Sequence, residues 1–141
     1  DLEIVNNSIC MTGIERLSER LLTTLSDGER QRAFIAKALA QQTPLILLDE
    51  PTAFLDYAGK IEILQLLRQL SRHEKKTIIL STHDLEQALH LADRLWLVNK
   101  QGNFVEDTPS EAARKGLLEE YLGGTGFHFS GTEIRLDSDI G

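Results

Sequence analysis

The chain has 141 residues, of which 41% are hydrophobic and 26% charged, as in an ordinary globular protein with a core. The net charge of −7 disfavours nucleic acid as a main partner, since phosphate binding favours a basic surface. The single cysteine, Cys10, excludes an internal disulfide, and the longest apolar runs, of about four residues, are far too short to span a bilayer. Because the first residue is Asp1 and not Met, we expect a piece of a longer protein or a processed chain.

The first 41 residues predict one clear helix. Residues 1–24 are mixed in pattern, and only Leu17, Leu21 and Leu22 are spaced for one face of a helix. Residues 26–41 begin with residue types that cap helices and continue through an alanine-rich stretch with little polar face. This second segment therefore predicts a well-buried helix.

The middle of the chain alternates between strands and helices. Pro44 ends the first helix, and the apolar residues 45–48 predict a short buried strand. Apolar residues then recur at the spacing of one helix face, at Ile63, Leu66, Leu67 and Leu70. Residues 75–80 and 94–98 predict two more strands, with a short helix capped by Asp84 between them.

The last third predicts a hairpin and then helices. A turn leads into residues 104–107, the hairpin partner of the third strand. Residues 108–122 predict one broken helix or two short helices around Gly116, with Ser110 as the cap. Residues 123–136 predict a glycine-rich loop and two small strands. Strands that alternate with helices indicate an α/β fold with a mostly parallel sheet.

Polar side chains follow two of the predicted strands. Asp49 and Glu50 come directly after the first strand, and His83 follows the second. Ligands of open α/β sheets bind at the carboxyl ends of the strands. Asp49 could hold Mg²⁺ through water, and Glu50 could act as a general base on a water molecule. A strand that ends in a solvated turn explains the acidic pair equally well, and a lone histidine is more often structural.

A second candidate site lies at the start of the predicted helix. "LSDGE" brings a hydroxyl (Ser26), a glycine (Gly28) and a helix N-terminus together. Free backbone N–H groups and the helix dipole favour an anion at such a place. For this segment alone, a plain helix cap is the better interpretation.

Taken together and in this order, these segments resemble the second half of an ATP-binding cassette ATPase. "LSDGERQR" is similar to the family signature, "LILLDEP" to the Walker B strand, "TAFLD" to the D-loop and "STHD" to the switch-histidine segment. The resemblance implies part of a P-loop (RecA-like) α/β core. Residues 1–43 would then end a helical subdomain that carries the signature, and residues 44–141 would form the second half of the ATPase core.

The resemblance also implies roles for the strand-end residues. Asp49 would serve the Mg²⁺ of MgATP, and Glu50 would activate the attacking water. His83 would hold the γ-phosphate and that water. Because phosphoryl transfer depends on positioning and charge stabilisation, these roles require a nucleotide already held by its phosphates.

Other residues are implied to act across a dimer. Ser26 and Gly28 would grip the γ-phosphate of ATP bound to the opposite subunit, and Asp56 would couple the two subunits. Two residues depart from the family pattern: Asp27 replaces the first glycine of the signature's usual pair, and Glu29 replaces a commoner glutamine. Since Asp27 adds negative charge beside a phosphate site, we expect weaker ATP binding in trans.

The sequence contains no G-x-x-x-x-G-K-[ST] phosphate loop, and no glutamine loop is recognisable. Its only Gly-Lys pair, Gly59-Lys60, is followed by isoleucine. We therefore expect the chain to lack the family's first half and to be inactive alone. In the family it resembles, the strand before the phosphate loop lies between those matching residues 77–80 and 95–98. Without that strand, the chain would be structurally incomplete.

Importer subunits are the best match within the family. "LSTHDLEQALHLADRLWLV" resembles them, and "ALAQQTPLILLDEPTAFLD" resembles the iron-chelate, haem and cobalamin group. The resemblance implies a cytoplasmic subunit, peripheral on the inner face of the cell membrane and not inserted into it. Its partners would be an identical or paired cassette subunit and membrane permease subunits.

Two other classes stay open. One is a non-transport relative, either a chromosome-maintenance ATPase or a translation factor. Long heptads beside the signature, or a basic linker to a second cassette, would mark these, and the acidic charge disfavours both. The other is a non-catalytic binding fragment, which a test of nucleotide binding would distinguish from an enzyme.

Overall fold

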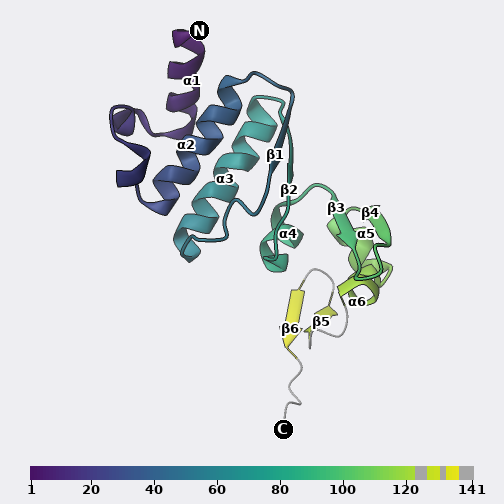
Figure 1. The fold of residues 1–141 in the computed structure, drawn as a ribbon. Coiled ribbons are helices and arrows are strands. Elements are labelled where there is room, and N and C mark those ends of the chain that lie inside the picture. Colours follow the sequence, from purple (N-terminus) through teal and green to yellow (C-terminus); the bar gives the residue numbers. More distant parts are fainter. Residues whose placement is uncertain (123–126, 131–132, 137–141) are drawn as a thin grey trace. The chain divides into compact units, whose positions relative to one another are not determined.

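A computed structural model describes residues 1–122, 127–130 and 133–136 of the chain (Figure 1). The chain divides into two compact units, Asp1–His83 and Asp84–Gly141. All of the expected site residues fall in the first unit. Within the described residues, no helix combines the length and the apolar character needed to cross a membrane.

The first unit contains helices packed on a parallel pair of strands. Its elements are α1 (Leu2–Thr12), the 3-10 helices η1 (Glu15–Leu17) and η2 (Leu22–Thr24), α2 (Asp27–Ala40), β1 (Leu45–Leu48), α3 (Tyr57–His73) and β2 (Thr77–Leu80). The predicted helix after residue 26 and the first two predicted strands are confirmed.

The helix α1 was not predicted, because its buried positions are polar in sequence. Ser8 is 5% exposed and Thr12 is fully buried. Each hydroxyl donates to a carbonyl one turn back, Ser8 to Ile4 at 2.8 Å and Thr12 to Ser8 at 3.0 Å. Small side chains whose hydroxyls are satisfied inside the helix can be buried against a neighbour at little cost.

The leucines expected to form one helix face do not do so. Leu17 ends one 3-10 helix and Leu22 begins another. Leu21 is 73% exposed and Leu22 is 49% exposed. Helical spacing in this short segment therefore predicted the wrong structure.

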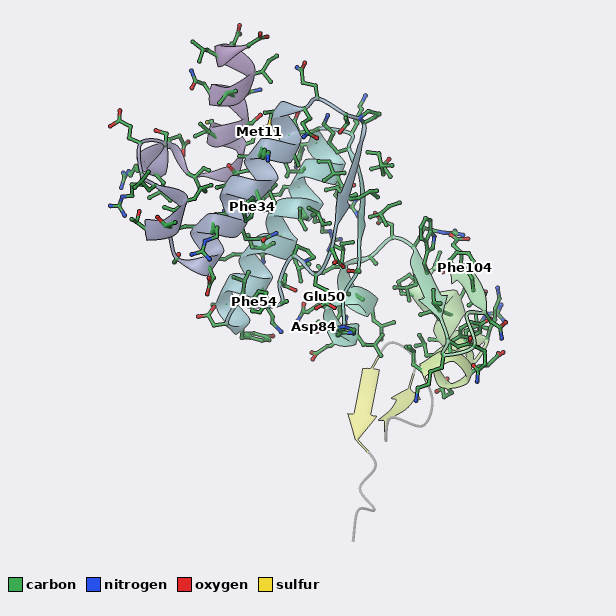
Figure 2. All side chains as sticks on the ribbon, in the orientation of Figure 1. Met11, Phe34, Glu50, Phe54, Asp84 and Phe104 are labelled. Carbon is green, nitrogen blue, oxygen red and sulfur yellow. The ribbon has the colours of Figure 1, made fainter. Side chains whose placement is uncertain are left out.

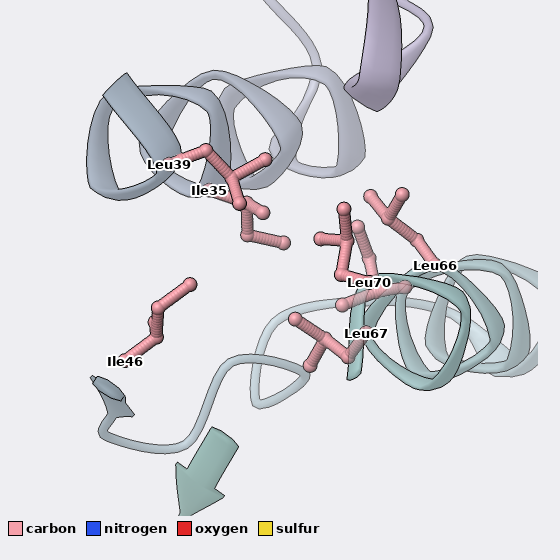
Figure 3. Close-up of a cluster of buried hydrophobic side chains, with 7 residues drawn as sticks. Ile35, Leu39, Ile46, Leu66, Leu67 and Leu70 are labelled. Carbon is pink, nitrogen blue, oxygen red and sulfur yellow. The ribbon is translucent and has the colours of Figure 1, made fainter. Parts of the chain in front are cut away.

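The hydrophobic core of the first unit lies between α2, α3 and β1 (Figure 3). The four α3 residues predicted from their spacing are all buried in it. Its members are Ile35, Leu39, Ile46, Ile63, Leu66, Leu67 and Leu70. The expectation that α2 is well buried holds only in part: Ile35, Ala36 and Leu39 are buried, whereas Phe34 of the same helix (labelled in Figure 2) remains 48% exposed.

Strand β1 is covered on one face only. Ile46 is 3% exposed and points into the core, whereas Leu45 and Leu47 are 43% and 68% exposed. Successive side chains of a strand point to opposite faces, so one layer of helices covers only alternate residues. The prediction of a buried strand therefore holds only for the side chains on the core face of β1.

The second unit contains short helices and two antiparallel hairpins. Its elements are α4 (Leu85–Leu91), β3 (Leu95–Val98), β4 (Phe104–Asp107), α5 (Pro109–Arg114), α6 (Leu117–Leu122), β5 (Phe127–Ser130) and β6 (Glu133–Leu136). The predicted hairpin of β3 with β4 and the two small strands near the C-terminus are confirmed. Residues 123–126, predicted as a loop, lie outside the described residues.

Two details of the predicted helices concern their ends. Asp84 caps α4 as expected, accepting a hydrogen bond from the Gln87 N–H at 3.3 Å. Thr108, and not Ser110, caps α5, since its hydroxyl accepts from the Glu111 N–H at 3.2 Å. The two-helix alternative is confirmed: α5 and α6 are separated at Gly116, whose φ of 70° lies in the left-handed region that glycine tolerates.

The fold class is α/β, as predicted. The ladder of β1 with β2 is parallel and in register from Leu45 opposite Thr77 to Leu48 opposite Leu80. The other two ladders among the described residues are antiparallel. The parallel ladder positions the candidate site, because the carboxyl ends of β1 and β2 lie side by side.

Candidate functional site

The predicted catalytic groups meet where β1 and β2 end. Leu48 and Leu80 are paired, so the residues that follow them leave the sheet at the same edge. The Ser81 N–H donates to the Leu48 carbonyl at 3.0 Å, which continues the ladder by one step. Asp49 and Glu50 follow β1 directly, and Glu50 lies at this edge in Figure 2.

Glu50 and His83 are in direct contact. Glu50 Oε1 lies 2.5 Å from His83 Nε2, while the side chains are 38% and 88% exposed, respectively. A histidine this exposed does not serve as a core residue. The structure thus brings a carboxylate and an imidazole together at the strand ends, where each could act on a bound water or phosphate.

The backbone of Glu50 is unusual. Its φ is 42°, in the left-handed region that side chains with a Cβ seldom adopt. Such strained residues occur preferentially at functional sites, where surrounding contacts hold them. The Glu50 carbonyl accepts from the Ala53 N–H at 3.1 Å in the turn that follows.

Ser81 is a site residue that the sequence reasoning missed. Its hydroxyl donates to Asp49 Oδ1 at 2.5 Å and accepts from the Glu50 N–H at 3.0 Å. The available signal was its position, since it follows the second parallel strand just as Asp49 follows the first. Recognising this required the register between two segments more than thirty residues apart.

The Asp49 carboxylate is suited to be one ligand of a divalent cation whose other ligands come from water and substrate. Its Oδ1 accepts from Ser81, and Oδ2 has no hydrogen bond or ion pair within the described part of the chain. No group of three or more His, Cys, Asp or Glu side chains in that part could hold a metal by itself. A single carboxylate suits Mg²⁺, which commonly keeps several waters and binds substrate phosphates.

The signature segment forms a complete capping box at the start of α2. The Ser26 hydroxyl accepts from the Glu29 N–H at 3.3 Å, and the Glu29 carboxylate accepts from the Ser26 N–H at 2.8 Å. This reciprocal pair satisfies two backbone donors at the helix N-terminus. The hydrogen bond from the Ser26 backbone N–H is the main reason why the pKa of Glu29 is lowered. Glu29 therefore has a structural role within this chain.

Asp27 and Gly28 have different surroundings. Asp27 Oδ1 lies 3.2 Å from Arg30 Nη1, so a neighbouring cation offsets part of the charge that was expected to weaken phosphate binding. A Cβ atom at Gly28 would meet no atom within 4 Å. Packing within the chain therefore does not require glycine at this position, which leaves room for close approach from outside.

Asp56 caps α3. Its Oδ1 accepts from the Gly59 N–H at 2.8 Å, and a Cβ at Gly59 would lie 2.9 Å from that same oxygen. Among the described residues, no hydrogen bond or ion pair joins Asp56 or the capping box to the strand-end group. The structure thus brings Glu50 and His83 into contact beside Asp49, whereas Asp56 and the capping box each cap a helix.

The capping box gives an acid-sensitive contact. The pKa of Glu29 is lowered in the folded chain, so its carboxylate stabilises α2 fully at pH values above the ordinary pKa of a glutamate. This contribution is lost as the pH falls through the lowered pKa. We expect the protection of the Ser26 amide from hydrogen exchange, corrected for intrinsic rate, to fall over that acid range. The variant Glu29→Gln should show no such fall.

Glu3→Gln is the matched control, since Glu3 lies in the first turn of α1, whose N-cap makes no side-chain capping bond. It should leave the acid response of the Ser26 amide unchanged. An identical acid response in wild type and Glu29→Gln would contradict the assigned role of the carboxylate.

The family pattern described as ABC transporter matches residues 3–53. The achromobactin transport ATP-binding protein of Dickeya dadantii is 44% identical over 119 residues, which are 84% of this chain and 44% of that protein. A petrobactin import ATP-binding protein of Bacillus anthracis is 42% identical over 134 residues, or 94% of this chain and 49% of that protein. The chain thus spans about half the length of the curated relatives it matches.

Two solved structures are similar to the chain at the level of the fold. One is cbiO1 from Clostridium perfringens, part of the ABC transporter complex cbiONQ, with a TM-score of 0.73 and 34% identity over 84% of this chain and 48% of that one. Another is the dimeric ATP-binding cassette MJ0796 bound to ADP and Pi, with a TM-score of 0.63 and 33% identity over 76% and 46%. Over most of its length the chain is therefore similar to part of the ATP-binding cassette of ABC transporters.

Proposed function

We propose that this chain is part of the ATP-hydrolysing subunit of an importer that takes up iron chelates. The observation that carries the proposal is the contact of Glu50 with His83 beside Asp49, at the carboxyl ends of two parallel strands. Support for the substrate class comes from relatives whose names refer to achromobactin transport and petrobactin import. Haem and cobalamin are alternative substrates within the same group of importers, and a cobalamin import protein is also among the relatives.

Each strand-end residue has a separate task in this proposal. Asp49 would hold Mg²⁺ through water, and the bound ion would offset negative charge on the phosphates of ATP. Glu50 accepts a proton from the attacking water. His83, whose imidazole already contacts Glu50, orients that water and the γ-phosphate. The turn at Glu50 keeps its carboxylate near the imidazole.

The proposal includes a head-to-tail dimer. Ser26, Asp27, Gly28 and Glu29 face ATP bound to the second cassette, and Asp56 couples the two subunits. The open surroundings of Gly28 and the dimeric state of the MJ0796 cassette support this arrangement. The ATPase subunit lies on the inner face of the cell membrane, and membrane permease subunits complete the importer. Residues 1–43 end the helical subdomain, and residues 44–141 form the second half of the ATPase core.

The complete cassette, meaning a protein of the relatives' length that contains this chain, is the material for the test. We expect it to bind and hydrolyse MgATP. The 141-residue chain alone should bind MgATP at least about 100-fold more weakly, because no glycine-rich phosphate loop occurs in it. Titration calorimetry measures both affinities. Equal affinity would show that this chain holds a phosphate site of another kind.

Transport is tested separately from hydrolysis. Cells that contain the complete cassette and its permease should take up radiolabelled iron supplied as a ferric siderophore, and deletion of the cassette should abolish that uptake. Uptake that is unchanged by the deletion would rule out the importer role, whether or not the cassette hydrolyses ATP.

A further inference from the structure

One hydroxyl group joins the two acidic residues of the strand-end site. Ser81 Oγ lies 2.5 Å from Asp49 Oδ1 and 3.0 Å from the Glu50 backbone nitrogen. A serine hydroxyl has one donor and two acceptor sites, so it can make both bonds at once. Its proton points to the Asp49 carboxylate, and a lone pair receives the Glu50 N–H.

The bond to Glu50 lies at a strained residue. With φ at 42°, the Glu50 backbone is in a conformation that needs support from its surroundings. The Ser81 hydroxyl supplies such support from the residue that follows β2. Because φ determines the direction in which the side chain leaves the backbone, this bond helps to keep the Glu50 carboxylate on His83.

The bond to Asp49 limits the rotation of its carboxylate. With Oδ1 held by Ser81, Oδ2 is left for a further ligand. Hydrogen bonds to a charged acceptor are short and strong, and partners of this kind orient metal-binding carboxylates. Ser81 thus acts on the metal-binding residue through its side chain and on the general base through its backbone.

The sheet does not need the Ser81 hydroxyl. The backbone N–H of Ser81 already donates to the Leu48 carbonyl at 3.0 Å, and Ser81 is exposed. A residue without the hydroxyl can keep this backbone pairing and the register of β1 with β2. The hydroxyl's two bonds therefore serve the site and not the fold.

We propose that Ser81 is a positioning residue that sets the Asp49 carboxylate and the Glu50 backbone for MgATP hydrolysis. This inference rests on the proposed function, and it adds a residue to the strand-end site. It predicts that loss of the hydroxyl lowers the turnover rate and raises the Mg²⁺ concentration needed for activity, with a smaller effect on ATP binding. The conservative replacement by threonine should restore both.

The first experiment compares Ser81→Ala, Ser81→Thr and Ser81→Val in the complete cassette. Ser81→Ala should lower kcat about tenfold and raise the Mg²⁺ concentration for half-maximal activity by a similar factor, while KM for ATP changes less than about threefold. Ser81→Thr should stay within about threefold of wild type. Ser81→Val, which has the shape of threonine without the hydroxyl, should resemble Ser81→Ala.

Unchanged kcat and Mg²⁺ dependence in Ser81→Ala would overturn the proposal, as would a threonine variant no better than valine. The second experiment also uses the complete cassette and needs no hydrolysis. Hydrogen exchange at the Glu50 amide should accelerate about tenfold in Ser81→Ala and Ser81→Val but not in Ser81→Thr. A Glu50 amide equally protected in all four proteins would also overturn the proposal.

The two experiments separate the two levels of inference. If the complete wild-type cassette hydrolyses no ATP, the proposed function fails, whatever the Ser81 variants do. If wild type is active and the variants match it, the function stands and the role of Ser81 is refuted.

Discussion

Glu50→Gln is expected to abolish ATP hydrolysis by the complete cassette while ATP binding persists. The amide keeps the size and shape of the side chain but cannot accept a proton from water. Loss of a positioned general base commonly costs about 10²-fold or more in rate. Glu50 Oε1 lies against His83 at the ends of β1 and β2, so the carboxylate occupies the place this role requires.

Steady-state hydrolysis and calorimetric titration with MgATP measure the two effects of Glu50→Gln. Glu74→Gln is the matched control, because Glu74 is an exposed glutamate at the end of α3. It should behave as wild type in both measurements. Turnover near wild type in Glu50→Gln would remove Glu50 from the mechanism.

His83→Ala should cut hydrolysis about 10²-fold with a smaller effect on nucleotide affinity. The imidazole is 88% exposed, so its removal leaves no cavity and should not change the midpoint of denaturant unfolding. His73→Ala, which removes another exposed histidine at the end of α3, is the control and should be active.

A combined variant tests whether the two residues act as a unit. Because Glu50 and His83 touch, the double variant Glu50→Gln with His83→Ala should lose little more activity than Glu50→Gln alone. Multiplied losses would show that they act independently.

If the single variant His83→Ala instead unfolds at a lower denaturant concentration and keeps its specific activity, the histidine is structural.

Local sequence patterns predicted the elements whose causes are local. The helical spacing of Ile63, Leu66, Leu67 and Leu70 identified the buried face of α3, and all four side chains are in the core. Capping residues placed the start of α2, since a hydroxyl and a carboxylate three residues apart satisfy the helix end without help from the rest of the chain.

Patterns failed where a neighbouring element decides the outcome. The buried face of α1 consists of Ser8 and Thr12, which are buried because α2 packs on that helix. No periodicity of apolar residues marks such a face. In β1 the apolar run predicted a buried strand, but helices cover only the side of Ile46.

The sequence by itself determined three of the chemical groups in the candidate site, because Asp49, Glu50 and His83 each follow a recognisable strand. Only the tertiary structure decided that Glu50 contacts His83 and that Ser81 joins Asp49 to the Glu50 backbone. Order along a chain does not specify register. The parallel pairing of β1 with β2 brings residues more than thirty positions apart within hydrogen-bonding distance.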